Sequence, residues 1–363
     1  MEWLTSYSSD AAVSDGFKGR EDHRLLLAAG LFGEAGSVLA EIKKKEREAE
    51  AYPAYRQRLT EELGDFLWYF VRLASLCDPP LLDTLSAEPA GGPTLRPDLD
   101  LSLDLGAAVG EVLRQLRAAS PLELYASLRL VWDNLTAIAS SAGIDLQEAA
   151  ILNLKKTQSR WPAKRCFHEL FDEDCPVEEQ IPRRLTIEFL ERKTRNRIEV
   201  LLRYNGVNIG ARLTDNISDP DGYRYHDAFH IAHAVFLGWS PVVRALLRCK
   251  RKSKLAIDEN EDGARAIIIE EAVSAIVFSR AKNMRFFERA KQVDYDLLKG
   301  IQEYVRGYEV ERVPIWQWET AIIEGYKVFG LLCSNRGGRV SWDLLERTLT
   351  WAPQIEARGG EAN

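Results

Sequence analysis

The chain has 363 residues, a length typical of two domains of ordinary size, each able to bury a core. Hydrophobic residues make up 46% and charged residues 28%, a balance that fits a globular protein and excludes a disordered or fibrous one. The formal net charge of −7 argues against broad, salt-dependent nucleic-acid binding, because such binding needs a basic surface.

The cysteines and the N-terminal region indicate a compartment. The 5 cysteines are odd in number and form no CxxC pair, which argues against a disulfide framework and favours a reducing environment. The longest early apolar run, residues 25–32, is too short to span a bilayer. We therefore expect a cytoplasmic protein without a membrane partner.

The first part of the chain has helical periodicity. Apolar residues recur at three- and four-residue spacing over about 21–50 and 55–77, and Pro53 separates these two helices. A stretch rich in Pro and Gly, from Pro79 to Pro97, predicts a loop. Further helices are expected over 103–118, 121–140 and 145–160, so residues 1–164 predict an all-α domain.

The second part has a different pattern. Charged residues and prolines over 165–184 predict a linker, and the following stretch has β-branched alternation around Asn205-Gly206, which predicts two or three antiparallel strands. Helices are expected from Tyr223 to the end. The predicted fold is mainly α: an N-terminal helical bundle, then an α+β domain over 185–363 with a small antiparallel sheet and several helices.

Acidic residues form a first constellation on two predicted helices. Glu34, Ser37 and Glu41 share one helical face, and Glu62 and Asp65 share a face of the next helix. Acidic residues at such spacing are usually a solvated face, but here Glu34 and Asp65 stand in apolar stretches, where a carboxylate needs a partner. Oxygen ligands favour Mg²⁺, with Mn²⁺ as an alternative.

Three segments carry a family resemblance. "GLFGEAGS" at 30–37, "EELGD" at 61–65 and the tail at 142–162 together resemble the MazG-like all-α NTP pyrophosphohydrolases, over about residues 20–162 with an insertion near 79–100. The resemblance implies Mg²⁺-dependent cleavage of a nucleoside triphosphate between its α and β phosphates, giving a monophosphate and pyrophosphate. It implies that Glu34, Glu62 and Asp65 are catalytic metal ligands, and that the protein is a homo-oligomer, a dimer or tetramer.

Ser37 departs from the family pattern, which has a second glutamate at this position. A hydroxyl supplies no negative charge, and the nearest substitute ligand, Glu41, lies about 10 Å from Glu34 along the helix axis. It would serve a second cation or none.

Four further residues are expected at the substrate. Asn153, Lys156 and Arg160 share a face of the closing helix and suit a contact with a triphosphate or a base, although cations near a helix end also favour its dipole. Trp68 could stack on a base, although aromatic residues at such positions more often belong to a core.

A second constellation lies in the C-terminal half. His226, His230 and His233 stand at i, i+4 and i+7 in an apolar helix, and Glu270 and Glu271 interrupt another apolar helix. Such a cluster is a metal site or a hydrogen-bonded structural network. Asp227 next to His226 is reminiscent of metal phosphohydrolases. This half resembles the C-terminal region that accompanies MazG-like domains in some two-domain bacterial proteins, and the resemblance implies no activity for it.

Three hypotheses follow. The first is an N-terminal nucleotide pyrophosphohydrolase. The second is a catalytically weak nucleotide sensor or regulatory module, for instance in antiviral defence, because Ser37 removes one anion from the site. The third places the chemistry in the C-terminal histidines and glutamates, as a metal phosphohydrolase.

Overall fold

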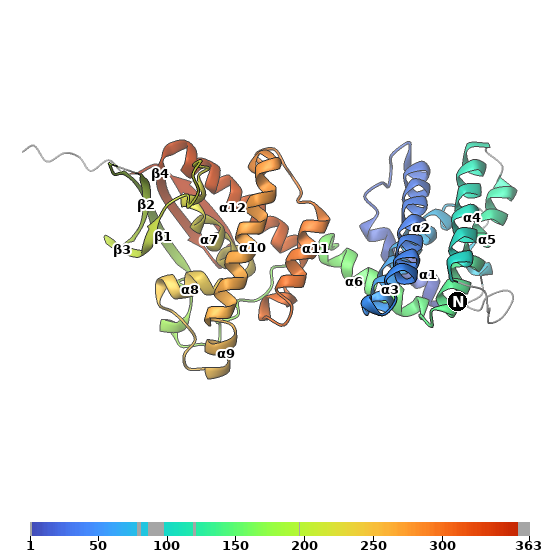
Figure 1. Ribbon diagram of the computed structural model, residues 1–363, viewed down its shortest axis with the longest axis horizontal. Helices are drawn as coiled ribbons and strands as arrows, with labels where there is room; N and C mark the ends of the chain where they lie inside the picture. The colour runs from blue at the N-terminus through green and yellow to red at the C-terminus, as the bar shows by residue number, and fades with distance from the viewer. Residues whose placement is uncertain (1, 78–80, 86–97, 119–120, 196, 355–363) are drawn as a thin grey trace, which may run out of the picture. The chain divides into compact units, whose positions relative to one another are not determined.

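The computed structural model describes residues 2–77, 81–85, 98–118, 121–195 and 197–354 (Figure 1). The chain forms two compact units, Met1–Arg165 and Cys166–Asn363. The predicted fold class is confirmed, since the first unit is helical and the second combines helices with an antiparallel sheet. Most of the expected loop 79–97 lies outside the described residues.

The first unit is a helical bundle. Its helices in the described residues are α1 Glu2–Ala11, α2 His23–Glu48, α3 Tyr55–Ala74, α4 Asp98–Ala118, α5 Pro121–Ser141 and α6 Leu146–Arg160. α2 packs against α3 and α4, α4 packs against α5, and α6 packs against α3 and α1. The sequence patterns had predicted all of these helices except α1.

Apolar spacing explains the packing of α3. Leu59, Leu63, Phe66 and Phe70 recur every three or four residues, and all four are fully buried. α6 begins at a capping residue, because the Asp145 side chain accepts a hydrogen bond of 2.8 Å from the Gln147 backbone N–H. Local sequence signals thus account for both of these helices.

A buried carboxylate ties the start of α2 to α3. The Asp15 side chain accepts hydrogen bonds from His23 Nε2 at 2.9 Å and Arg72 Nε at 3.1 Å. Burial alone would raise the pKa of Asp15, but these partners and the Phe17 backbone N–H outweigh it and lower the pKa. The ionised form of Asp15 therefore stabilises the folded first unit.

One helical segment in the described residues, His23–Ala51, is long and apolar enough to cross a membrane. Length and apolar composition are weak evidence for a membrane span, because the core helices of soluble proteins share them. Leu27, Leu31, Val38 and Ile42 of this helix are buried in the core of the first unit, whereas Leu25 and Phe32 are exposed.

The second unit is a five-stranded sheet covered by helices. The strands β1 Arg184–Lys193, β2 Ile198–Tyr204, β3 Val207–Leu213, β4 Gly337–Asp343 and β5 Thr348–Ala352 are antiparallel in the order β3-β2-β1-β4-β5. The helices are α7 Asp227–Leu237, α8 Pro241–Leu247, α9 Leu255–Asn260, α10 Ala264–Asn283, α11 Tyr295–Tyr304 and α12 Ile315–Asn335. α7 and α12 pack against each other and against β4 and β5, and α10 lies outside this pair (Figure 1).

The strands both confirm and correct the predictions. The Asn205-Gly206 turn between β2 and β3 is present, with φ of 49° and 77°, as a type I′ hairpin requires. The expectation that helices continue to the end of the chain was wrong, because β4 and β5 follow α12. Gly337 makes the pairing of β4 with β1 possible, since a Cβ there would lie 2.3 Å from the Phe189 backbone oxygen.

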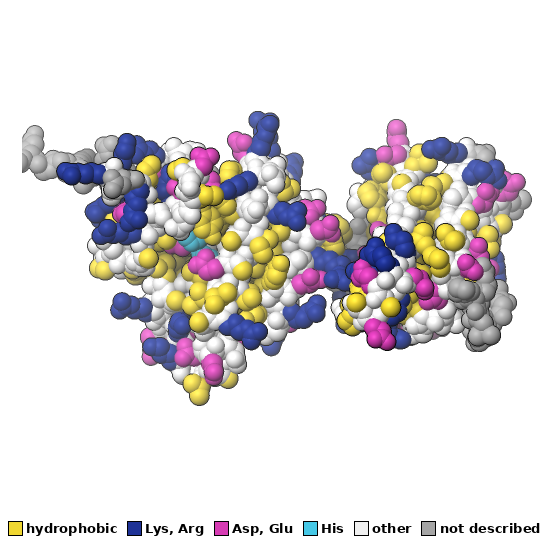
Figure 2. Space-filling view, viewed as in Figure 1, with side chains coloured by type: hydrophobic (Ala, Val, Ile, Leu, Met, Phe, Trp, Pro, Cys, Tyr) yellow, Lys and Arg dark blue, Asp and Glu magenta, His cyan; other side chains and the backbone are white. Residues whose placement is uncertain are grey.

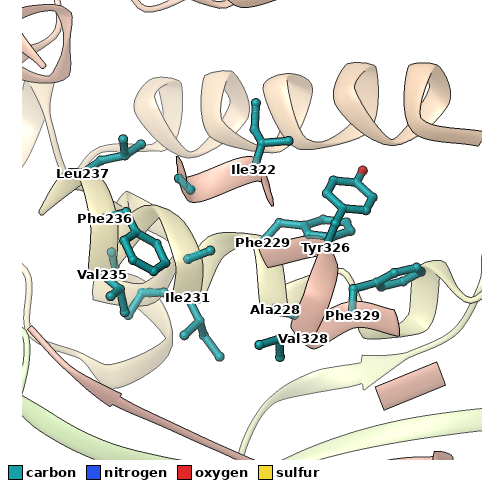
Figure 3. Packing of buried hydrophobic residues seen from close by; sticks show 14 of the residues in the cluster. Ala228, Phe229, Ile231, Val235, Phe236, Leu237, Ile322, Tyr326, Val328 and Phe329 are labelled. Atoms are coloured by element: carbon teal, nitrogen blue, oxygen red, sulfur yellow. The ribbon is translucent and has the colours of Figure 1, made fainter. Parts of the chain in front are cut away.

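The core of the second unit lies where α7 meets α12. Phe229 of α7 stacks on Tyr326 of α12 with 4.4 Å between ring centroids, and Phe329 lies 5.3 Å from Phe229 (Figure 3). Gly325 allows this close contact, because a Cβ there would lie 3.0 Å from the Ala232 side chain. α7 is therefore held rigidly, together with the histidines that it carries.

The segment expected as a linker is part of the second unit. Leu170 and Ile181 are buried in its core, and the buried Asp172 carboxylate binds Arg244 at 2.8 Å and Arg183 at 2.7 Å. Its charged residues suggested a linker, but Asp172 is paired inside the fold, whereas Glu173, Asp174 and Glu178 are exposed.

A second buried ion network lies beside this segment. The Arg251 side chain is fully buried and donates to Asp262 and Glu309, with shortest N–O distances of 2.7 and 2.6 Å. These partners supply the charge balance that a buried guanidinium needs.

Candidate functional sites

Three carboxylates converge in the first unit. Glu34 comes from α2, and Glu62 and Asp65 come from α3. Each offers an oxygen within 4.8 Å of the others, and all three side chains are half-buried. This is the arrangement that sequence spacing and the family resemblance predicted, and it would suit a cation.

Two glycines let the helices approach closely enough to build this cluster. A Cβ at Gly30 of α2 would lie 2.1 Å from the Tyr69 ring of α3, and one at Gly64 of α3 would lie 2.7 Å from the Ala149 backbone oxygen of α6. Gly30 lies one turn before Glu34, and Gly64 directly precedes Asp65. The helices therefore meet at the acidic residues.

α6 contributes an amide and a cation to the cluster. Asn153 Nδ2 donates to Asp65 Oδ1 at 2.8 Å, and Lys156 Nζ donates to Asp65 Oδ2. Lys156 also lies 3.5 Å from Glu61 Oε1. The Tyr7 hydroxyl donates to Asn153 Oδ1 at 2.9 Å, which leaves the Asn153 amide N–H to face Asp65.

The acidic cluster changes the protonation of Glu34. Burial and the neighbouring charges of Asp65 and Glu62 raise the pKa of Glu34 to about 7, against the opposing effects of Lys156 and a hydrogen bond from Ser37. Oxygen ligands of this kind fit Mg²⁺ or Mn²⁺.

Glu270 organises a second cluster, inside the second unit. This fully buried carboxylate accepts hydrogen bonds from His230 Nδ1 at 3.0 Å and from His233 Nδ1 at 3.1 Å. The Ser240 hydroxyl binds the same carboxylate at 2.8 Å, and the Val242 backbone N–H donates to it at 2.9 Å. Glu270 is therefore bound by four groups from α7, α8 and the residue before α8.

The opposite edge of His230 faces other acidic groups. His230 Nε2 lies 3.4 Å from Glu271 Oε2, and His226 Nε2 lies 3.7 Å from Asp227 Oδ1 and 3.9 Å from Glu271 Oε2. His226, Asp227 and His230 also offer ligand atoms within 4.8 Å of one another.

This part of the cluster opens to solvent. His226, Asp227 and Glu271 line an open pocket of about 500 Å³ with residues of β3 and α8 and with Arg248. Figure 2 shows a histidine at the surface of this unit with an acidic side chain beside it.

The charges in this cluster depend on one another. Burial alone would lower the pKa of His230, but the charges of Glu270 and Glu271 and the hydrogen bond to Glu270 raise it to about 10. Burial raises the pKa of Asp227 although His226 and His230 oppose the shift. The pKa of Glu271 is lowered, because His230 outweighs the effect of burial. A positive charge among these carboxylates is therefore strongly favoured.

Comparison with known proteins identifies the second unit. The family model of the MazG C-terminal domain matches residues 166–355, more than half of the chain. The chain belongs to the MazG C-terminal domain family. No curated protein and no solved structure matches the chain.

The MazG C-terminal domain match covers the sheet, the histidine helix α7 and the glutamate helix α10. It begins at residue 166, where the second unit begins. The expectation that this half is the region found with MazG-like domains is therefore confirmed, and the chain is MazG-related. The match does not include the first unit, so the resemblance of residues 20–162 to MazG-like pyrophosphohydrolases stays a prediction.

Three predicted residues of this MazG-related chain lie outside the carboxylate cluster. The Glu41 carboxylate accepts a hydrogen bond from the Tyr52 hydroxyl instead. Trp68 is buried and donates from Nε1 to Ser14 Oγ at 3.0 Å, so its ring belongs to the core. Arg160 is buried, with its guanidinium 4.7 Å from the Trp161 ring centroid.

Sequence reasoning missed two groups at this site. Tyr7 lies 146 residues from Asn153 along the chain, and no local pattern marks it. Glu61 directly precedes Glu62 and reaches Lys156. The charge patterning of α3 could have indicated Glu61, because it stands four residues before Asp65 and so shares its helical face.

Proposed function

We propose that the first unit is a Mg²⁺-dependent nucleoside triphosphate pyrophosphohydrolase that cleaves between the α and β phosphates and releases a monophosphate and pyrophosphate. The observation that carries this proposal is the convergence of Glu34, Glu62 and Asp65 from two helices on one point. The MazG C-terminal domain in the same chain supports it independently.

In the proposed reaction the side chains of the site have different roles. Glu34, Glu62 and Asp65 would hold Mg²⁺, which supplies neutralisation of the phosphate charge and a lower pKa for the attacking water. Lys156 carries a positive charge at the same point and is placed to bind a phosphate oxygen. Asn153 orients Asp65, and Tyr7 orients Asn153.

Ser37 supports a second candidate function. Its hydroxyl binds Glu34 and lowers the pKa of that group, but it adds no negative charge to the site. A site with one anion fewer binds Mg²⁺ more weakly. The alternative is therefore a sensor that binds a nucleotide without turning it over, for instance in antiviral defence.

One experiment separates the two candidates. The full chain is incubated with a panel of NTPs and dNTPs and Mg²⁺, and released pyrophosphate is measured. An enzyme releases pyrophosphate from at least one nucleotide, whereas binding by calorimetry without release supports the sensor. A protein that neither binds a nucleotide nor releases pyrophosphate would refute both candidate functions.

Three variants define the site in this assay. Glu62→Gln removes one ligand charge and is expected to abolish release, while Ser37→Glu restores a charge and is expected to raise it. Glu111→Gln is the matched control, because Glu111 lies on α4 in an exposed pair with Arg114. Loss of activity in the control, or none in Glu62→Gln, would contradict the proposed site.

The proposed enzyme is also a cytoplasmic homo-oligomer, a dimer or tetramer, whose partner is its nucleotide rather than a membrane or nucleic acid. Leu25 and Phe32 stand seven residues apart on one face of α2, with 53% and 50% of their surface exposed. Light scattering would measure the molar mass, and Phe32→Glu is expected to lower it. A wild-type protein of monomer mass would refute the oligomer.

A further inference from the structure

We propose that the second unit holds a site for a divalent transition-metal ion of the zinc class, formed by Nε2 of His226, Nε2 of His230 and the carboxylates of Asp227 and Glu271. This site is separate from the proposed nucleotide chemistry of the first unit. It also differs from the ligand set that the sequence suggested, since Asp227 joins it and Glu270 and His233 do not.

The spacing of the four groups fits one ion. Ligand atoms about 2.1 Å from a tetrahedral ion lie about 3.4 Å apart. The observed separations are 3.4 Å between His230 Nε2 and Glu271 Oε2, 3.7 Å between His226 Nε2 and Asp227 Oδ1, and 3.9 Å between His226 Nε2 and Glu271 Oε2. These three separations exceed the tetrahedral spacing by at most about 0.5 Å.

Hydrogen bonds on the far side of each ring set the correct tautomer. His226 Nδ1 lies 2.9 Å from the Tyr223 backbone oxygen, and His230 Nδ1 lies 3.0 Å from Glu270 Oε1. Both oxygens only accept, so each ring carries its proton on Nδ1. In the neutral rings, a lone pair on Nε2 therefore faces the shared point, as metal ligation requires.

His230 provides an independent sign of a missing partner. Its side chain is 1% exposed, and Nε2 has no hydrogen-bond partner among the described residues although it points towards Glu271. A lone pair on nitrogen that faces a carboxylate oxygen is repelled unless a proton or a metal ion lies between them. A metal ion at this point would satisfy both atoms.

The charges of the cluster also favour a bound cation. Asp227, Glu270 and Glu271 are three carboxylates within one cluster, and in the part of the chain that the structure describes no Lys or Arg forms an ion pair with them. Buried carboxylates require a positive partner. A divalent cation supplies it more completely than one protonated histidine.

Glu270 does not ligate the ion but holds the His230 ring in position through a hydrogen bond to Nδ1. Its carboxylate binds the Nδ1 atoms of both His230 and His233, and it is itself fixed by Ser240 and the Val242 backbone N–H. A carboxylate that accepts from the far nitrogen of a ligating histidine is the usual second partner at metal sites. The His233 ring packs on Trp318, with 5.5 Å between ring centroids, rather than on the shared point.

The site has an entrance. His226, Asp227 and Glu271 line the open pocket of about 500 Å³, whereas His230 closes its buried side. An ion can therefore enter from solvent and can accept a fifth ligand from the pocket. Arg248 at the same pocket adds a positive charge that suits an anionic ligand of the bound ion.

The test measures Zn²⁺ binding to the full chain. Protein carrying Glu62→Gln, which weakens the carboxylate site of the first unit, is treated with a chelator and titrated with Zn²⁺ in excess Mg²⁺ by calorimetry. Elemental analysis then gives the stoichiometry. We expect one tightly bound Zn²⁺ per chain, and we expect Co²⁺ in its place to give the visible absorption of a nitrogen-ligated ion.

Two added substitutions probe the ligands. His226→Asn and Glu271→Gln are each expected to weaken Zn²⁺ binding by more than the roughly 10- to 100-fold that loss of an outer partner costs. Glu271 is the safer position for folding, because 42% of its side chain is exposed. His168→Asn is the matched control, because the same change is made outside the cluster.

The result tests this metal site independently of the proposed pyrophosphohydrolase activity of the first unit. Absence of tight Zn²⁺ binding, unchanged binding in a folded Glu271→Gln protein, or equal loss in His168→Asn would overturn the proposal. None of these outcomes bears on pyrophosphate release, which depends on Glu62 and its neighbours.

Discussion

Replacing Gly64 by alanine tests whether close contact between α3 and α6 builds the carboxylate site. A Cβ at this position would lie 2.7 Å from the Ala149 backbone oxygen and 3.2 Å from Asn153 Cβ. Carbon and carbonyl oxygen normally approach to about 3.3 Å, so α6 would have to move by about 0.6 Å. The oxygen belongs to a helix backbone and cannot rotate away.

The effect on stability has two opposing parts. Overpacking costs about 1–3 kcal/mol, whereas alanine favours a helix over glycine by about 1 kcal/mol. The net loss of unfolding free energy is therefore about 0–2 kcal/mol. Gly110→Ala on α4 is the matched control, because a Cβ there would meet nothing within 4 Å. It shows the helix effect alone, and urea unfolding compares the two variants.

The effect on activity is expected to be larger. Moving α6 by about 0.6 Å would stretch the Asn153–Asp65 hydrogen bond from 2.8 Å to about 3.4 Å, beyond the usual range. A hydrogen bond to a charged group contributes about 1.5–3 kcal/mol, so kcat/KM for pyrophosphate release should fall about 10- to 150-fold. Gly110→Ala should leave it unchanged.

The reasoning fails if Gly64→Ala gains as much stability as Gly110→Ala and keeps wild-type activity. That outcome would mean that α6 is not held against α3 at this point. Equal losses of activity in both variants would also contradict it, because Gly110 is remote from the carboxylates along the chain.

Three further predictions follow from individual contacts. Asp15→Asn should cost about 3–5 kcal/mol of unfolding free energy at pH 7. Because the folded pKa of Asp15 is lowered, the difference between variant and wild type should shrink as the pH falls below about 4. Urea unfolding of both proteins at pH 7 and below pH 4 checks this. Asp262→Ala leaves the buried Arg251 without its main partner and should cost about 3–5 kcal/mol, seen by calorimetry as a lower transition temperature of the second unit; an unchanged transition would contradict it. Tyr7→Phe removes the donor that orients Asn153 and should lower kcat/KM about 2- to 10-fold without unfolding the protein, whereas wild-type kinetics would show that the amide keeps its orientation alone.

Local periodicity predicted the helices but not the full sheet. The spacing of Leu59, Leu63 and Phe66 is visible in any short window, and the structure confirms α3. β4 is different, because its partner β1 lies about 150 residues earlier in the chain and no local signal specifies that pairing. The alternation that places Val340 and Trp342 in the core is only a few residues long, and the preceding apolar helix obscured it.

The candidate site was predictable where one helix supplies its residues. Three-residue spacing placed Glu62 and Asp65 on one face, and resemblance to a family, rather than spacing, joined them to Glu34. Trp68 shows the limit of this approach: it follows Asp65 by three residues, yet its ring packs in the core and only Nε1 reaches a polar partner. Which edge of a half-buried helix faces the site depends on neighbours that are distant in sequence.

The histidines show why spacing alone does not assign ligands. At i, i+4 and i+7, His226, His230 and His233 are equivalent in the sequence, but their hydrogen bonds separate them. His230 gives Nδ1 to Glu270 and directs Nε2 towards Glu271, whereas His233 gives Nδ1 to the same carboxylate and packs its ring on an aromatic core. A glutamate 40 residues away thus decides which nitrogen is available. Because that choice leaves nitrogen ligands here and only oxygen ligands at Glu34, Glu62 and Asp65, the two clusters should select different metal ions.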